Sequence, residues 1–164
     1  MFKKKTRATV NLGAFIATPD SLIDPLIGFA GLNVQSLFLD LGSGDGKVVM
    51  DIADKTGCKA IGIENNPELV KRALTSLEPR GLSEKVEFIC DDAMDYKPDQ
   101  IVTAHMFVPV RSLRSMVPTL MSNLHPGSQI IAHEQRAPKK LPKPDNSELL
   151  LSDTALTVAH RWQV

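Results

Sequence analysis

Residues 38–46 read Phe-Leu-Asp-Leu-Gly-Ser-Gly-Asp-Gly, an apolar run that contains an acid and then breaks into glycines at every second position. An apolar run of this kind is typical of a strand buried in a parallel sheet. Glycines directly after such a strand let the backbone turn sharply and approach a ligand where no side chain would fit. The stretch predicts a buried strand, a ligand-binding loop and a helix that begins near Gly46.

The glycine spacing excludes two better-known loops. A dinucleotide-binding loop needs glycines at its first, third and sixth places, but the sixth place counted from Gly42 is Lys47. A phosphate-binding P-loop needs a glycine before its Gly-Lys pair and a Ser or Thr after it, where this chain has Leu41 and Val48. The carboxylate of Asp40 would repel phosphates, whereas it suits a cationic ligand that carries an ammonium and a sulfonium group.

A second apolar strand is expected over residues 59–63, and it leads directly to Glu64. An acid at this place can accept hydrogen bonds from both hydroxyls of a ribose, as an acid about 20 residues after a dinucleotide loop does. Asn66 and Pro67 then supply an N-cap and a proline in the first turn, which predict a helix through about Leu82.

These motifs resemble those of the class I S-adenosylmethionine-dependent methyltransferases. The resemblance implies that S-adenosylmethionine is the cofactor. It also implies that the acid after the strand expected over residues 86–90, Asp92, binds the adenine amino group, while Asp91 is interpreted as a turn residue. The cofactor-binding residues implied by the resemblance are Thr18, Pro19, Asp40, Gly42, Ser43, Gly44, Gly46, Glu64, Asn65, Asp92 and Ala93.

A closer resemblance is to small archaeal protein-lysine methyltransferases and to the mitochondrial enzymes that modify a lysine of the ATP synthase c subunit. In that family a Tyr-Val-Pro-Thr-Pro segment packs over the cofactor; Thr18 and Pro19 match it, while Phe15 and Ala17 depart from it. The resemblance implies a protein substrate that presents a lysine. It is carried by residues 15–19, 40–46, 62–64 and 132–134.

The acceptor site is harder to infer than the cofactor site. A lysine amine, with a pKa of about 10.4 in water, must lose its proton before it attacks an activated methyl group. His133 and Glu134 are the candidates for lining this site, and His105 and Phe107 for the wall of an acceptor channel. Other interpretations stay open: His133 as a satisfied imidazole at a strand end, Glu134 as a surface acid and Phe107 as a core residue.

Other functions also stay open at this point. Residues 104–109 read Ala-His-Met-Phe-Val-Pro, which lacks the Asp/Asn-Pro-Pro-aromatic loop common in enzymes that methylate exocyclic amines or glutamine. A methyltransferase acting on a small metabolite or RNA is one alternative. A non-catalytic nucleotide-binding or regulatory module on the same fold is another, and a nicotinamide-dependent oxidoreductase is disfavoured by Lys47.

Strands and helices are expected to alternate through most of the chain, which predicts an α/β fold with a parallel sheet wrapped on both faces. With the resemblance, the fold class is a doubly wound, Rossmann-like, seven-stranded methyltransferase sheet, mostly parallel with an antiparallel C-terminal edge strand. The remaining expected elements are a helix capped by Thr18 and kinked or divided at Pro25, a strand over 100–107, a helix over 111–124 broken near Pro118, a strand over 128–133, a loop over 137–144, and strands over 148–151 and 154–162.

The candidate residues share one position in this fold. Ligands of open parallel sheets bind beyond the carboxyl ends of the strands, where the strand order reverses. Each candidate from Asp40 to Glu134 ends or follows an expected strand, so we expect one crevice to collect them.

The composition excludes several classes of partner. The chain has 164 residues with 19 basic and 19 acidic side chains, so its net charge gives no argument for stable binding to nucleic acid or to an anionic membrane. Residues 8–17 are too broken for a membrane anchor. We expect a single domain over residues 1–164, with residues 1–14 as a flexible or covering segment, and a monomer.

The four histidines show no spacing typical of a metal site, so no metal is expected. Cys58 and Cys90 lie too far apart for a Cys-x-x-Cys motif, and both are expected as buried free thiols in a reducing cytoplasm.

Overall fold

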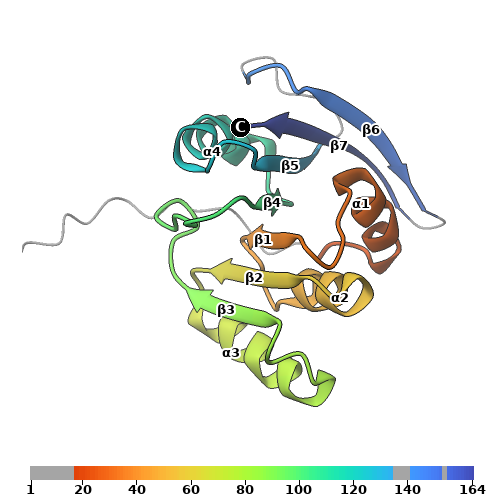
Figure 1. Cartoon of the computed structure of the whole chain (residues 1–164), viewed down its shortest axis with the longest axis vertical. Coiled ribbons are helices and arrows are strands. Elements are labelled where there is room, and N and C mark those ends of the chain that lie inside the picture. The colour runs from red at the N-terminus through yellow and green to blue at the C-terminus, as the bar shows by residue number, and fades with distance from the viewer. Residues whose placement is uncertain (1–16, 135–140, 153–154) are drawn as a thin grey trace, which may run out of the picture.

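Seven strands form one sheet in the computed structural model, which describes residues 17–134, 141–152 and 155–164 (Figure 1). In chain order the elements are the 3-10 helix η1 (Asp20–Leu22), α1 (Ile23–Ala30), β1 (Leu37–Leu41), α2 (Lys47–Thr56), β2 (Lys59–Glu64), α3 (Pro67–Leu77), the 3-10 helix η2 (Glu78–Arg80), β3 (Val86–Cys90), β4 (Thr103–Met106), α4 (Val110–Asn123), β5 (Gln129–Glu134), β6 (Asn146–Leu151) and β7 (Leu156–Gln163).

The strand order is β3-β2-β1-β4-β5-β7-β6. Strands β1 to β5 pair in parallel, and β7 runs antiparallel to both of its neighbours, β5 and β6. This arrangement confirms the predicted fold class, with the reversed strand β7 one place inside the edge strand β6. The order reverses between β1 and β4, so the loops after these two strands diverge and leave room for a ligand between them.

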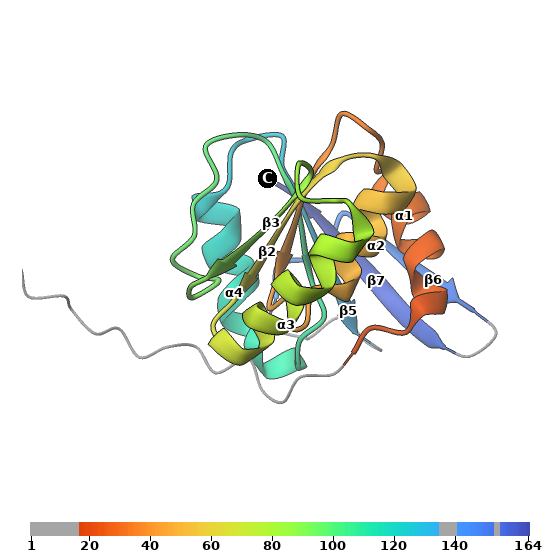
Figure 2. The same ribbon diagram turned by 90° about the horizontal axis from the view of Figure 1, so that it is seen from below.

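Helices cover both faces of the sheet, but unequally. Helices α1, α2 and α3 lie on one face and α4 lies on the other (Figures 1 and 2). Alternate residues of β1 pack into the hydrophobic clusters on the two faces of the sheet. Phe38 packs in the cluster that contains α1 and α2, and Leu39 packs in the cluster that contains α4. Because side chains alternate along a strand, Asp40 points to the same face as Phe38.

The start of the first helix differs from the prediction. The residue at the N-cap position of η1 is Pro19 rather than Thr18, and no side chain caps this turn. The helical segment is divided between Leu22 and Ile23, before Pro25. Pro25 lies in the first turn of α1, where a backbone N–H has no partner within the helix, so α1 tolerates it.

Two further helices differ from the prediction. Helix α3 ends at Leu77 rather than near Leu82, because Pro79 cannot donate the next helical hydrogen bond and the chain continues as η2. Pro118 lies inside α4, which is continuous over Val110–Asn123, so the expected break is wrong.

The remaining strands are shifted by a few residues. The fourth strand is shorter than predicted, β5 extends to Glu134, and β6 begins at Asn146. The predicted start of β7 at Thr154 lies outside the described residues, as do residues 1–16 and part of the 137–144 loop.

The two cysteines differ in exposure. Cys58 is buried, as predicted, whereas Cys90 is exposed, so the prediction of its burial is wrong. The reason is its position as the last residue of β3, which is an edge strand of the sheet. Among the helices that the structure describes, none is both long and apolar enough to cross a membrane.

Candidate active site

The loop between β1 and α2 depends on its glycines. Gly42, Gly44 and Gly46 have φ angles of 83°, 58° and 79°, in the left-handed region that other residues rarely adopt. At Gly46 there is also no space, since a Cβ would overlap the ring of Phe88 and lie 2.8 Å from the Cβ of Ala73. The glycine pattern of the sequence therefore reflects both a backbone conformation and a close approach.

Hydrogen bonds fix this loop to the end of β2. The backbone amides of Gly42 and Ser43 both donate to the carbonyl of Ile63, at 2.8 and 3.0 Å. The half-buried carboxylate of Glu64 accepts from the amide of Gly44 at 3.0 Å and from the amide of Asn66 at 2.8 Å. Glu64 thus joins the loop after β1 to the loop after β2, a structural role that the sequence did not indicate.

The turn after β3 lies beside the end of β2. The amide of Asp91 donates to the carbonyl of Glu64 at 3.1 Å. Asp91 accepts from the amide of Asp92 at 2.8 Å, which confirms it as a turn residue, and the carboxylate of Asp92 accepts from the amide of Met94 at 2.9 Å. Ala93 is buried, and the exposed Asn65 follows β2 directly.

A pocket opens where the strand order reverses, between the ends of β1 and β4. It brings together several predicted residues from distant parts of the sequence, but not Glu64, Asp92 or His133. Its lining residues are Ala17, Thr18, Asp40, Gly42, Ser43, Asp45, Lys47, Val48, His105 and Phe107.

Asp40 and His105 form a buried pair at this pocket. The two residues are register partners on β1 and β4, and His105 Nδ1 lies 2.7 Å from Asp40 Oδ1. Both side chains are almost completely buried. An ionised carboxylate can only accept hydrogen bonds, so we infer that Nδ1 carries a proton and donates a hydrogen bond to Asp40. The sequence predicted both residues near the site but not their contact, because 65 positions separate them.

His133 packs against this pair. Its ring lies edge-on to the rings of His105 and Phe107, with centroids 5.0 and 5.3 Å apart. Burial, with smaller contributions from His105 and His160, holds the pKa of His133 well below 6.5, so the ring is neutral. Neither ring nitrogen has a hydrogen-bond partner among the described residues, which argues against the satisfied-imidazole interpretation.

Glu134 ends β5 and pairs through its backbone with Val158. Its side chain lies outside what the structure describes, so its predicted role stays a prediction.

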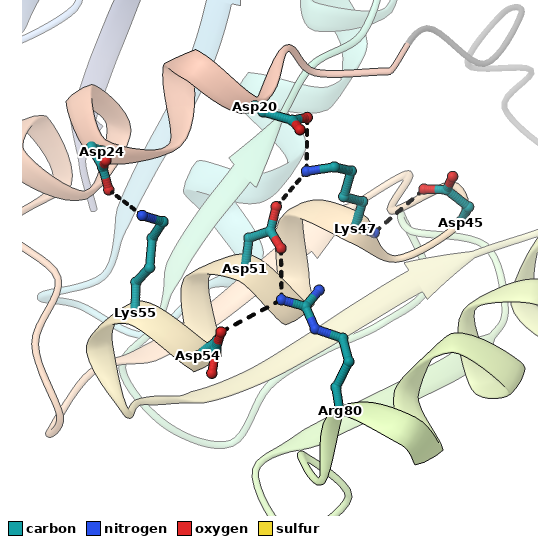
Figure 3. A network of polar contacts seen from close by, with 8 residues as sticks. All are labelled: Asp20, Asp24, Asp45, Lys47, Asp51, Asp54, Lys55 and Arg80. Atoms are coloured by element: carbon teal, nitrogen blue, oxygen red, sulfur yellow. Dashed lines mark hydrogen bonds and ion pairs between the residues drawn. The ribbon is translucent and has the colours of Figure 1, made fainter.

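A network of ion pairs links the pocket to its surroundings (Figure 3). Lys47 Nζ lies 2.8 Å from a carboxylate oxygen of Asp20 and 2.5 Å from one of Asp51. Arg80 contacts Asp51 at 2.8 Å and Asp54 at 3.7 Å. The network therefore ties the segment before α1 to α2 and to η2. Only its Lys47–Asp51 pair was open to sequence reasoning, through its four-residue helical spacing.

The network also shifts two pKa values. Burial alone would lower the pKa of Lys47, but hydrogen bonds to Asp20 and Asp51 raise it above 10.5. Burial alone would raise the pKa of Asp51, but its bonds to Lys47 and Arg80 lower it below 3.8. In the part of the chain that the structure describes, no cluster of three or more His, Cys, Asp or Glu residues has the geometry to hold a metal ion.

Comparison with known proteins points to one family. The model of the ANTKMT methyltransferase domain family matches residues 40–143, which is more than half of the chain. The matched range begins at the acid before the glycine loop and includes β2, β3, β4, α4 and β5.

Among curated proteins, the chain is 25% identical over 121 residues to a protein-lysine N-methyltransferase of Saccharolobus islandicus, covering 73% of this chain and 75% of that protein. It is 27% identical over 157 residues to norajmaline N-methyltransferase of Rauvolfia serpentina, covering 87% of this chain but 54% of that enzyme.

Among solved structures, an RNA methyltransferase of Salinibacter ruber in complex with S-adenosyl-L-homocysteine superposes with a TM-score of 0.79 at 25% identity. The match covers 91% of this chain and 94% of that one.

Proposed function

The chain belongs to the ANTKMT methyltransferase domain family, and we propose that it transfers a methyl group from S-adenosylmethionine to the side-chain amine of a protein lysine. The family match and the shared sheet make it a class I S-adenosylmethionine-dependent methyltransferase. The observation that carries the lysine acceptor is the likeness to the Saccharolobus islandicus enzyme over 73% of this chain.

The residues that the structure describes fit the cofactor. S-adenosylmethionine supplies a methyl group activated on a sulfonium. The glycines after β1 adopt left-handed backbone angles that other residues rarely adopt, and Ser43 Oγ is buried with no partner among the described residues. We assign the methionine end of the cofactor to the pocket between β1 and β4, where Asp40 and the segment with Thr18 and Pro19 lie.

The nucleoside end is assigned to the ends of β2 and β3. Glu64 ends β2 and Asn65 follows it, while Asp92 and Ala93 follow β3. The two strand ends are joined by the hydrogen bond from the amide of Asp91 to the carbonyl of Glu64. We propose that Glu64 holds the ribose and that Asp92, with the amide of Ala93, holds the adenine. Glu64 keeps acceptor capacity for this role, because each carboxylate oxygen can accept more than the single backbone bond it has here.

The acceptor side is assigned to His105, Phe107 and His133. His105 and Phe107 line the pocket, and His133 packs edge-on against both of their rings. Methyl transfer requires the amine and the methyl group to be aligned in a site that excludes water. We propose that these residues provide that alignment, with Glu134 at the end of β5 near the target ammonium.

Radiolabelled methyl transfer tests this function. The purified chain is incubated with methyl-labelled S-adenosylmethionine and with lysate of the source cells, and the labelled material is treated separately with protease and with ribonuclease. We expect protease to release the radiolabel, and acid hydrolysis to recover it as methyl-lysine. A reaction inhibited by excess S-adenosylhomocysteine is the control. Label that ribonuclease releases, with no labelled lysine, would contradict the proposal.

RNA is the second candidate acceptor, because the Salinibacter ruber RNA methyltransferase matches nearly the full length of this chain. The balanced charge of this chain, with 19 basic and 19 acidic side chains, favours the protein acceptor. A non-catalytic module is not favoured, because the chain belongs to a methyltransferase family and has the full glycine loop.

We also propose that the chain works as a single domain, as a monomer and in the cytoplasm. The two free cysteines support a reducing compartment. Sedimentation at several concentrations checks the monomer, since a self-associating chain would sediment faster at higher concentration.

A further inference from the structure

Buried polar atoms without partners gather near the pocket between β1 and β4. Among the described residues, His105 Nε2 and both ring nitrogens of His133 are buried with no hydrogen bond. Such atoms are rare in folded proteins, and each one needs an explanation. His105 also lines the pocket assigned to the reacting groups, and Nε2 is the nitrogen of its ring that has no partner among the described residues.

Asp40 determines which nitrogen of His105 is free. Its carboxylate oxygen Oδ1 lies 2.7 Å from Nδ1 and accepts a hydrogen bond from the Nδ1–H group, which leaves the lone pair of Nε2 available. The ring is held in place from β1 as well, because Phe38 stacks on it with centroids 5.6 Å apart. Asp40 is thus placed to orient the imidazole and to stabilise it when it becomes positively charged.

The other charged and titratable groups around His105 do not oppose a positive charge on it. From β5 the facing group is His133, which is neutral because burial depresses its pKa. From the loop after β1 and the start of α2, the pocket is lined by Asp45 and Lys47. The ammonium of Lys47 is bound by Asp20 and Asp51, so its charge is neutralised within its own network.

We propose that His105 accepts the proton of the target lysine and that Asp40 is its positioning residue. This inference rests on the proposed lysine acceptor. The substrate ammonium gives one proton to His105 Nε2, and the freed lone pair of the amine attacks the activated methyl carbon. The nitrogen–carbon bond forms as the carbon–sulfur bond breaks, and that electron pair stays on sulfur. The methylated amine leaves as an ammonium, and His105 returns its proton to water.

The pH dependence of methyl transfer to poly-L-lysine, at saturating cofactor, tests the role of His105. For the wild type we expect kcat to rise tenfold per pH unit on the acidic limb, as loss of one proton requires, and then to level off. His105→Gln is expected to lower kcat at saturating cofactor by about 100-fold or more and to lose this limb. The control His125→Gln changes an exposed histidine and should leave the profile unchanged.

Asp40→Asn separates positioning from simple packing. Its amide keeps the shape and a hydrogen bond but not the charge, so the imidazolium of His105 is less stable and the acidic limb should move to lower pH. The inference is overturned if His105→Gln keeps both the acidic limb of the wild type and a near wild-type kcat.

Nitrogen-15 NMR of the histidine rings measures the tautomer of His105 in the wild-type chain. This test needs no variant that could fail to fold, and it needs no substrate. The inference requires the Nδ1–H tautomer for His105 at neutral pH, and the Nε2–H tautomer would overturn it. A wild type that binds cofactor but methylates neither poly-L-lysine nor lysate protein would instead refute the proposed function. The tautomer result would still decide whether His105 has a free Nε2.

Discussion

The Glu64 carboxylate and the His133 imidazole lie at the ends of β2 and β5, and they differ in how their polar atoms are used. Each oxygen of Glu64 already accepts a backbone N–H, from Gly44 or Asn66. Neither nitrogen of His133 has a partner among the described residues. The cofactor end of the site is therefore held in shape by its own hydrogen bonds, whereas the acceptor end has bonding capacity left for a substrate.

The largest expected effect comes from breaking the cofactor end at Gly46. In Gly46→Ala the new Cβ meets Phe88 and Ala73, and φ stays at 79°, so we expect the free energy of unfolding to fall by about 3 kcal/mol. Gly28→Ala is the matched control, because apart from its chain neighbours and the backbone of α1 no heavy atom lies within 4 Å of its Cβ position; it should stabilise α1 by about 0.8 kcal/mol. Urea denaturation measures both, and equal stability of the two variants would contradict the close packing at Gly46.

Removal of the Glu64 carboxylate tests the same end of the site through cofactor affinity, without unfolding the chain. Glu64→Ala should weaken binding of S-adenosylhomocysteine by about 1.5–3 kcal/mol, because charge-assisted hydrogen bonds are lost. The chain should remain folded. Glu84→Gln alters an exposed acid away from the site and serves as the calorimetric control. An unchanged affinity in Glu64→Ala would contradict the ribose role. Glu64 would then have only the structural role of joining the loops after β1 and β2.

The acceptor end predicts a pH dependence of stability through His133. Its pKa is depressed in the folded chain, so below pH 6.5 the unfolded chain binds a proton that the folded chain does not. Above pH 6.5 the ring is neutral in both the folded and the unfolded chain, and His133 costs no stability. As the pH drops from 6.5 towards the pKa of the folded chain, the free energy of unfolding falls by about 1.4 kcal/mol per pH unit.

In His133→Gln this component should disappear, so the difference in unfolding free energy between the variant and the wild type must change with pH. Denaturant titrations over mildly acidic to neutral pH measure it, with His125→Gln retaining the wild-type slope. A constant difference between wild type and His133→Gln would mean that His133 titrates normally in the folded chain.

The smallest expected effect concerns the ion pair over the pocket. Asp20 and Lys47 are 78% and 38% exposed, so Asp20→Asn should lower stability by no more than about 0.5 kcal/mol, and less at high salt. Asp24→Asn breaks a comparable exposed pair with Lys55. We expect only Asp20→Asn to weaken cofactor binding, by a few fold, because Asp20 follows the segment that lines the pocket. Equal affinities of the two variants would separate this ion pair from the site.

The cofactor end could be predicted from the sequence because its signals are local. The glycines that require positive φ stand next to the strand that they follow, and the acids of β2 and β3 are each adjacent to an apolar run. The parallel sheet followed from the alternation of these runs with helical segments. The bond between Glu64 and Gly44 in the loop after β1 was missed, because it joins residues 20 positions apart.

The acceptor end could be predicted only as a set of candidates. The pair of Asp40 with His105 depends on the register of β1 against β4, which no local pattern encodes.

The exposure of Cys90 depends likewise on β3 being an edge strand. The N-cap at Pro19 and the continuity of α4 through Pro118 show that single prolines locate helix ends only approximately.

Calorimetric titration with S-adenosylhomocysteine, after mass spectrometry has shown the chain to be free of copurified ligand, tests most directly whether the loop after β1 is a cofactor site. We predict saturable binding at one site per chain, weakened in Glu64→Ala and unchanged in Glu84→Gln. A folded, ligand-free chain that binds neither S-adenosylhomocysteine nor S-adenosylmethionine would contradict the methyltransferase assignment.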